Sequence, residues 1–238
     1  MSEKRPDTPA DVKLQLRQES GFGCAICGVP FVQYHHIIPW AQDNHFRPED
    51  MMVLCPNDHH ACTVGAIPEQ AQRKAKLRPK NVIDGLARGP LYVTADNLTV
   101  DFAGGTITNV PNLLRVGGVN MLSCTRSQEG VVQVSAIVQN SLGKVVARIV
   151  NNEWSVPLAD VWDFEAHERH ATIRHGPGDI GLAVDCRKDR VQISGKWFIN
   201  SMPVSVSPKK LVFSGMTMAG NNLDNSGMNM PNAVVFDL

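Results

Sequence analysis

Two short motifs with metal-ligand spacing constrain the fold of the N-terminal third of this chain more than any other feature. The first is Cys24-x-x-Cys27 and the second is Cys55-x-x-Asp58. Pairs of this kind form two knuckles that gather four ligands round one tetrahedral zinc ion. We therefore predict a structural zinc site made by Cys24, Cys27, Cys55 and Asp58, with the surrounding fold built on it.

The fourth ligand position holds a carboxylate, whereas the other three hold thiols. A carboxylate is an allowed but weaker zinc ligand than a thiolate, and His60 and Cys62 are the nearest alternatives. We favour Asp58, because the two-residue gap that closes the first knuckle also separates Cys55 from Asp58. The competing interpretation is that the cysteines are small buried hydrophobic residues.

Adjacent histidines lie between the two knuckles in the segment YHHIIP, and His59 follows the second knuckle directly. Successive side chains of a strand point to opposite faces, so His35 and His36 should not bind the same ion. We predict that His35 and His59 hold a cation that stabilises the leaving oxygen of a phosphodiester. His36 would then act as general base towards water, because imidazole titrates near neutral pH.

The ordered segments CAICG, YHHIIPW and EDMMVLCPNDHH resemble the HNH endonucleases, whose ββα-metal motif often carries two zinc knuckles round its hairpin. The resemblance covers about residues 12–80. It matches His35 to the first metal ligand, His36 to the general base and His59 to the metal ligand on the helix. It implies hydrolysis of double-stranded DNA with Mg²⁺, or alternatively Mn²⁺ or Ni²⁺, as catalytic ion, Zn²⁺ in the knuckles, and products with 5′-phosphate and 3′-hydroxyl ends.

Three positions depart from the HNH pattern. Asp58 replaces the usual Cys or His of the second knuckle. Asp50 replaces the common Asn that braces the loop holding the base; we place it in the catalytic set, where its backbone carbonyl would orient His36, although the carboxylate lacks a donor. Thr63, four residues after His59, would be a poor third ligand, so the catalytic ion would rest on two histidines plus water and phosphate.

A basic segment, QAQRKAKLRPKN, follows the HNH-like motifs. It contains Arg73, Lys74, Lys76 and Arg78. Clusters of this kind usually supply phosphate contacts, although a solvated helix face has the same composition. The whole chain has 23 basic and 23 acidic residues, so binding of nucleic acid would need a local patch, and this neutral charge leaves RNA open as a substrate beside DNA. We predict that these four side chains bind the nucleic-acid backbone.

The chain changes character near residue 90. Before it, we predict a helix at residues 10–19, a β-hairpin in FVQYHHII, an apolar segment MMVLC, a helix carrying His59, and a helix that begins at Pro68 and stops before Pro79. From Leu91 onward, runs rich in Val, Ile, Thr and Phe alternate with Gly, Asn and Asp, which predicts an all-β domain. The segment AGNNLDNSGMNMPN is expected to form a long polar loop before a last strand.

These patterns together predict an α+β chain. An HNH nuclease module would occupy residues 1–80, a linker 81–90, and an all-β domain 91–238, sandwich-like or alternatively a β-solenoid. The β domain would serve target recognition, a regulatory partner or assembly of a homo-oligomer. His167, His170 and His175 in this half fit no metal site and are assigned no chemistry. His45, in a polar loop, is expected to be exposed.

The polar N-terminus lacks the apolar core of a signal peptide, and no run reaches the roughly 20 apolar residues of a membrane helix. We therefore expect a soluble, cytoplasmic protein without a membrane partner. Two alternatives to an active nuclease remain open. One is a catalytically inactive HNH fold used for DNA binding or as a scaffold, and the other is a sensor whose β domain restrains the nuclease.

Overall fold

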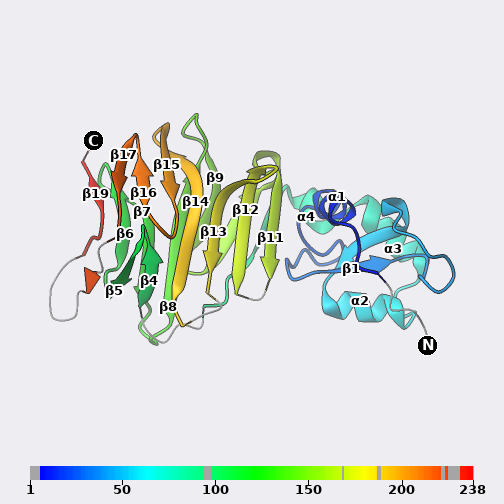
Figure 1. Cartoon of the computed structure of the whole chain (residues 1–238). Helices are drawn as coiled ribbons and strands as arrows, with labels where there is room; N and C mark the ends of the chain where they lie inside the picture. The colour runs from blue at the N-terminus through cyan, green and yellow to red at the C-terminus, as the bar shows by residue number, and fades with distance from the viewer. Residues whose placement is uncertain are drawn as a thin grey trace. The chain divides into compact units, whose positions relative to one another are not determined.

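The computed structural model describes residues 6–93, 98–167, 169–186, 189–220, 223–224 and 231–237. Two units make up the chain, Met1–Arg88 and Gly89–Leu238, and Figure 1 labels their elements. Helices α1 to α4 lie in the first unit, whereas strands build the second. The predicted α+β class, with an all-β C-terminal part, is therefore confirmed.

The N-terminal unit is organised round a two-stranded antiparallel sheet. β1 (Gln33–His36) pairs with β2 (Met51–Leu54), so that His35 lies opposite Met52 and His36 opposite Met51. α1 (Ala10–Ser20) and the short 3-10 helix η1 (Pro48–Asp50) precede β2, whereas α2 (Pro56–Thr63), α3 (Glu69–Leu77) and α4 (Lys80–Asp84) follow it. The predicted hairpin is present, and its second strand comes from the apolar segment MMVLC.

Glycine and proline set the helix bounds in this unit. Gly21, at φ 67°, ends α1 in the left-handed conformation, and its N–H binds carbonyls of the last turn. Pro68 caps α3 at its N-terminus, and α3 ends at Leu77, two residues before Pro79. The helices expected at residues 10–19, around His59 and between the two prolines are all confirmed.

β2 is buried on both faces, and its side chains divide between two apolar clusters. Met52 and Leu54 pack on one side with Ile37 and the knuckle residues Cys24 and Cys55, whereas Met51 and Val53 pack on the other with Leu16 of α1. Burial of these apolar side chains stabilises the fold, by roughly 25 cal/mol per Å² of apolar surface removed from water. The strand therefore holds the knuckles and α1 to opposite faces of the hairpin.

The segment at residues 81–90, expected to link two domains, contains most of α4 and all of β3 (Leu86–Pro90). Asn81 is buried, and its Nδ2 donates to the backbone oxygens of Gly21 and Gly28, both at 3.0 Å. These bonds join the end of α1 to the turn after the first knuckle. Asn81 is thus part of the N-terminal unit.

The C-terminal unit consists of strands in two antiparallel ladders. One ladder runs through β6 (Asn112–Val116), β7 (Val119–Arg126), β8 (Val132–Gln139), β9 (Val145–Val150) and β10 (Glu153–Pro157). The other runs through β11 (Asp163–His167), β12 (His170–Gly176), β13 (Asp179–Asp185), β14 (Val191–Ile199), β15 (Met202–Val206), β16 (Leu211–Phe213) and β17 (Met216–Met218). The short 3-10 helix η2 (Leu158–Asp160) lies between them in sequence.

Long-range pairings join these ladders. β4 (Thr99–Phe102) pairs with β5 (Gly105–Thr108) and lies parallel to β14. β18 (Leu223–Asp224) pairs in parallel with β5, and β19 (Val235–Phe236) pairs in parallel with β6. Phe198 of β14 lies opposite Gln139 of β8, so the long strand β14 belongs to both ladders. Alternate residues of β8 and β14 are buried, which is the period that a strand with one face on a core requires.

Antiparallel pairing between consecutive strands distinguishes the two alternatives for this half. A β-solenoid stacks its coils through parallel strands, whereas every pairing between strands consecutive in sequence is antiparallel in the residues described here. This pattern argues against the β-solenoid, and the described strands join into one closed, barrel-like sheet rather than the two separate sheets of a sandwich. Most of the polar loop expected at residues 219–232 lies outside the described residues. Within the part of the chain that the structure describes, no helix has the length and apolar character to span a membrane.

Candidate metal centres and catalytic site

The four predicted zinc ligands converge on one point of the N-terminal unit. The three sulfur atoms and an oxygen of Asp58 all lie within 4.8 Å of one another. Cys27 Sγ lies 3.7 Å from Cys55 Sγ, and Asp58 Oδ2 lies 3.1 Å from Cys24 Sγ. With Zn–S bonds of about 2.3 Å, tetrahedral geometry places two sulfurs about 3.8 Å apart and a sulfur and an oxygen about 3.5 Å apart. The donor set therefore fits a zinc ion in chemistry and in spacing.

The alternatives to Asp58 occupy other surroundings. His60 is exposed, whereas Cys62 is buried in the apolar cluster that also contains Met52 and Leu54. Neither belongs to the group of converging ligand atoms among the described residues. Asp58 also donates its backbone N–H to Cys55 Sγ at 3.4 Å, in the first turn of α2. The geometry therefore favours Asp58 as the fourth ligand.

Two thiols of this cluster, Cys24 and Cys27, have raised pKa values. Burial raises the pKa of Cys24, and the hydrogen bond to Asp58 adds to this rise. Burial also raises the pKa of Cys27. Burial opposes ionisation of Asp58 as well, but hydrogen bonds from the thiols of Cys24 and Cys55 outweigh it and lower the pKa of its carboxyl. A bound cation would stabilise the thiolates, so metal uptake would release protons.

β1 places the adjacent histidines in different surroundings, as alternation along a strand requires. The ring centroids of His35 and His59 lie 4.9 Å apart, with their planes at 87°. The ring of His36 lies instead near Trp40 and His45, with centroid distances of 5.6 and 5.0 Å. The structure thus brings together His35 and His59, the predicted pair of ligands, and gives His36 a separate set of neighbours.

His45 holds the ring of His36. The Nε2 atom of His36 donates to the backbone oxygen of His45 at 2.9 Å. His45 itself is only 5% exposed, and its ring binds the backbone oxygen of Ile38 at 3.2 Å and the backbone N–H of Arg47 at 3.2 Å. The expectation that His45 is exposed was wrong, because the loop folds inward round this ring.

The knuckles and the three predicted histidines lie in a segment that matches a known family. Residues 24–64 match the family model of the HNH endonuclease. No curated protein and no solved structure matches the chain. The matched HNH segment contains both knuckles and the three histidines His35, His36 and His59. The predicted resemblance is therefore confirmed for this segment, whereas α3, α4 and the β unit lie outside it.

Asp50, which occupies the position of the usual Asn in the HNH segment, has a different local role from the one expected. Its backbone oxygen accepts the N–H of Ile37 at 2.8 Å, which extends the β1–β2 pairing by one residue. Its carboxylate binds Arg47 and Arg73, both at 3.1 Å. Partial burial opposes its ionisation, but these hydrogen bonds lower its pKa. His45 thus provides a carbonyl for His36, the role that we expected of Asp50.

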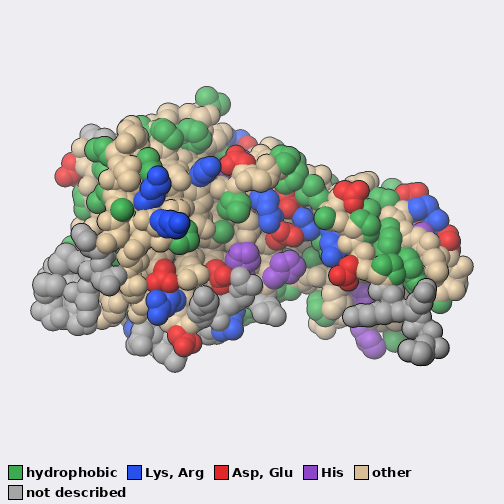
Figure 2. All heavy atoms as spheres, viewed as in Figure 1, with side chains coloured by type: hydrophobic (Ala, Val, Ile, Leu, Met, Phe, Trp, Pro, Cys, Tyr) green, Lys and Arg blue, Asp and Glu red, His purple; other side chains and the backbone are tan. Residues whose placement is uncertain are grey.

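Two of the predicted phosphate-binding side chains are paired with carboxylates. Arg73 binds Glu69 at 2.7 Å as well as Asp50, and Lys76 binds Glu19 at 2.7 Å. Lys74 and Arg78 are exposed and form no ion pair with any described residue. On the face shown in Figure 2, Lys and Arg side chains lie among Asp and Glu side chains over both units. Fewer basic side chains of this segment are therefore free to bind phosphate than its sequence suggested.

Thr63, expected to be a poor third ligand of the HNH ion, turns back on its own helix. Its hydroxyl donates to the backbone oxygen of His59 at 2.8 Å. Among the described residues, the His35–His59 pair forms no set of three ligands with another histidine, cysteine or carboxylate. An ion at this pair would therefore take its remaining ligands from water and substrate.

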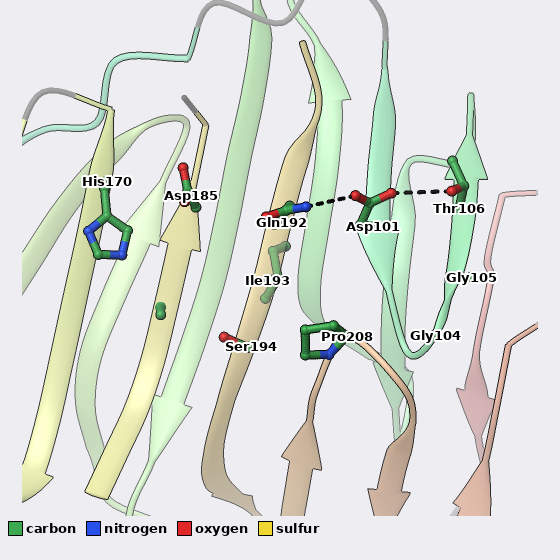
Figure 3. A pocket seen from close by; sticks show the side chains of 11 residues that line it. Asp101, Gly104, Gly105, Thr106, His170, Asp185, Gln192, Ile193, Ser194 and Pro208 are labelled. Carbon is green, nitrogen blue, oxygen red and sulfur yellow. Dashed lines mark hydrogen bonds between the residues drawn. The ribbon is translucent and has the colours of Figure 1, made fainter. Parts of the chain in front are cut away.

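The β unit carries a polar recess of about 310 Å³, shown in Figure 3. It is lined by Asp101, Gly104, Gly105, Thr106, His170, Ala183, Asp185, Gln192, Ile193, Ser194 and Pro208. Asp101 accepts hydrogen bonds from Gln192 at 2.9 Å, Arg190 at 3.1 Å and Thr106 at 3.2 Å. Partial burial opposes its ionisation, but these bonds outweigh it and lower its pKa. The Asp101 carboxylate that lines the recess is therefore paired within the β unit.

Three residues that contact the predicted site or its knuckle were not anticipated. Gln72 of α3 contacts His35 at 3.0 Å, His45 binds His36, and Asn81 of α4 braces the first knuckle. Gln72 is one of several polar residues of α3, so its residue type carries no sign of burial.

Proposed function

We propose that this chain is a metal-dependent endonuclease that hydrolyses phosphodiester bonds of double-stranded DNA. The HNH match identifies a nuclease-type domain, while the metal dependence and the DNA substrate are the proposal. Its main support is the arrangement on β1, where His36 is held by the His45 carbonyl while His35 lies beside His59. In this arrangement, His36 would transfer the proton while His35 and His59 bind the cation.

His36 is suited to act as the general base. A carbonyl oxygen only accepts hydrogen bonds, so the Nε2 atom of His36 carries the proton in its bond to His45. The lone pair of the neutral ring then lies on Nδ1, which would take a proton from water as the water attacks phosphorus. The imidazolium formed in this step would strengthen the Nε2–H bond to the His45 carbonyl, because charge-assisted hydrogen bonds are stronger than neutral ones.

His35 and His59 would hold the divalent cation, which we take to be Mg²⁺, Mn²⁺ or Ni²⁺. Two imidazoles with metal–nitrogen bonds of about 2.0–2.1 Å have ring centres at a separation similar to the 4.9 Å found here. When bound, such a cation neutralises charge on the scissile phosphate and the leaving oxygen. Zinc in the knuckles would serve folding, since a structural site of this kind contributes directly to the stability of a small unit.

Lys74 and Arg78 are the proposed first contacts with the DNA backbone, because both are exposed and unpaired among the described residues. Arg73 and Lys76 would exchange carboxylate partners for phosphate. Each phosphate contact of this type releases a counterion, so affinity should fall as salt rises.

A second candidate function is an inactive HNH fold that binds DNA or serves as a scaffold. The observation that favours it is the incomplete ligand set at His35 and His59, where the Thr63 hydroxyl binds its own helix. For the β unit, we propose a role in target recognition, regulation or assembly of a homo-oligomer, and restraint of the nuclease by this unit is the alternative to these roles.

Cleavage of supercoiled plasmid by the zinc-loaded full chain tests the proposal. We expect nicked or linear products with Mg²⁺, Mn²⁺ or Ni²⁺ and none in EDTA. The His59→Ala variant should lose this cleavage while retaining zinc, because His59 lies outside the converging knuckle ligands. DNA binding by the wild type without cleavage in any of these metals would favour the inactive fold instead.

A further inference from the structure

α3 carries one buried residue, and that residue is polar. Gln72 is 5% exposed, whereas the rest of the helix is partly or fully exposed. Burial of an amide without hydrogen bonds costs free energy. Both ends of the Gln72 amide are hydrogen-bonded, to Ile67 and to His35. The side chain is therefore held in one orientation.

The contact with Ile67 decides which way the amide faces. Gln72 Nε2 lies 2.9 Å from the backbone oxygen of Ile67, which can only accept a hydrogen bond. The amino group of Gln72 must therefore point at Ile67. Its oxygen, Oε1, then faces His35 Nε2 at 3.0 Å.

The orientation of Gln72 sets the tautomer of His35. An amide oxygen carries no hydrogen, so the Nε2 atom of His35 must be the donor in this bond. In the neutral imidazole, the lone pair is then on Nδ1. A metal ion binds the ring nitrogen that holds the lone pair. The hydrogen bond made by the other ring nitrogen fixes which nitrogen this is.

We propose that Gln72 is a positioning residue that holds His35 in its Nε2–H tautomer, so that Nδ1 is the ligand atom for the divalent cation shared with His59. The inference rests on the proposed metal site of the nuclease. It also gives α3 a role in the HNH site, although this helix lies outside residues 24–64 that match the family. The next residue, Arg73, binds Asp50 at 3.1 Å, so α3 is anchored to the hairpin region at two consecutive positions.

The tautomer is measured first, on the wild-type full chain with zinc in the knuckles and no other metal. Long-range ¹H–¹⁵N correlation NMR of the imidazole rings reports which nitrogen of each histidine is protonated. We expect His35 to show a protonated Nε2 and an unprotonated Nδ1. A His35 signal with the proton on Nδ1 would overturn the inference without any variant being needed.

Metal affinity is measured next by calorimetric titration with Ni²⁺, with zinc content followed throughout. Gln72→Met removes the acceptor at nearly constant side-chain length, and Gln70→Met is the matched control because Gln70 is exposed on the same helix. We expect Gln72→Met to weaken Ni²⁺ binding about 10- to 100-fold, the usual effect of losing such a partner. Gln70→Met should bind as the wild type does, and all three proteins should keep their zinc.

Gln72→Glu retains an oxygen acceptor for His35, so it should keep the Nε2–H tautomer and most of the Ni²⁺ affinity. Equal Ni²⁺ affinities of the wild type and Gln72→Met would overturn the inference, as would a wild type that binds no Ni²⁺ beyond the zinc site. These readouts do not depend on DNA cleavage. If plasmid stays intact while tautomer and affinities follow expectation, the positioning role stands and the nuclease proposal falls.

Discussion

The ring of His36 donates a hydrogen bond from Nε2 to the backbone oxygen of His45 across 2.9 Å. This bond leaves the lone pair of the neutral His36 ring on Nδ1, the nitrogen that a general base would use. His45 is itself held at both ring nitrogens by the backbone of the loop. The orientation of the proposed base therefore depends on how this loop is folded.

His45→Ala tests that dependence. The variant keeps the backbone carbonyl that binds His36 but removes the ring that binds Ile38 and Arg47. We expect the cleavage rate to fall about tenfold, the lower range for loss of a supporting partner, with little change in DNA affinity. Rates are measured on supercoiled plasmid, with His60→Ala as the exposed histidine control. A His45→Ala rate equal to that of His60→Ala would show that the ring does not position the base.

Asp58 variants test the zinc knuckle. A fourth thiolate binds zinc more strongly than a carboxylate, so Asp58→Cys should raise resistance to chelators and thermal stability. Asp58→Ala should lower both, because it removes one of four converging ligands. Competition with a chelator, followed by metal analysis, gives the order of affinities. If Asp58→Ala behaves as the wild type and Cys62→Ala loses zinc, Cys62 is the ligand.

Two lysines of α3 differ in a way that DNA binding can report. Lys74 is exposed and unpaired among the described residues, whereas Lys76 binds Glu19 at 2.7 Å. Lys74→Ala should reduce DNA affinity and lower the slope of log affinity against log salt by about 1. Lys76→Ala should have a smaller effect, since a carboxylate partner already neutralises the ammonium. Fluorescence anisotropy over a salt series measures both. A larger loss of DNA affinity in Lys76→Ala than in Lys74→Ala would contradict the assignment of Lys74 as the DNA contact.

Asp101 in the β unit predicts a pH-dependent stability difference. Its pKa is lowered because hydrogen bonds from Gln192 and Arg190 outweigh the opposing effect of burial. The stabilisation is therefore complete above the unfolded pKa of about 3.9 and is lost as pH falls through the lower folded value. Asp101→Asn should cost about 1 kcal/mol at pH 7, and this cost should shrink as the pH falls below about 3.9.

Urea unfolding of the β unit, followed by the fluorescence of its buried tryptophans Trp154 and Trp197, measures this difference. Asp179→Asn is the control, since Asp179 is an exposed carboxylate of the same unit. A cost for Asp101→Asn that stays constant from pH 7 to pH 3 would show that the ionised carboxylate contributes nothing to stability.

Local spacing predicted the parts of this molecule that depend on local chemistry. The helix at residues 10–19, the helix bound at Pro68 and the separation of His35 from His36 follow from short-range rules, and the metal-ligand spacing within each knuckle predicted that the two knuckles meet. Period-two runs of β-branched residues predicted the all-β half for the same reason.

The parts that could not be predicted depend on contacts between distant segments. Gln72 is buried because His35 and Ile67 satisfy its amide, and nothing within its own helix indicates this. Asn81 looked like part of a linker, but it bonds to Gly21 and Gly28. Arg73 and Lys76 looked like free cations until the fold placed Asp50 and Glu19 beside them.

The rate of plasmid cleavage by His36→Ala tests the central claim most directly. The zinc-loaded variant should keep its fold and its zinc, because His36 is not among the converging ligands. In the metal that best supports the wild type, we predict that cleavage falls about 10²- to 10⁴-fold, the usual share of a positioned general base. A His36→Ala rate close to that of the wild type would contradict the account.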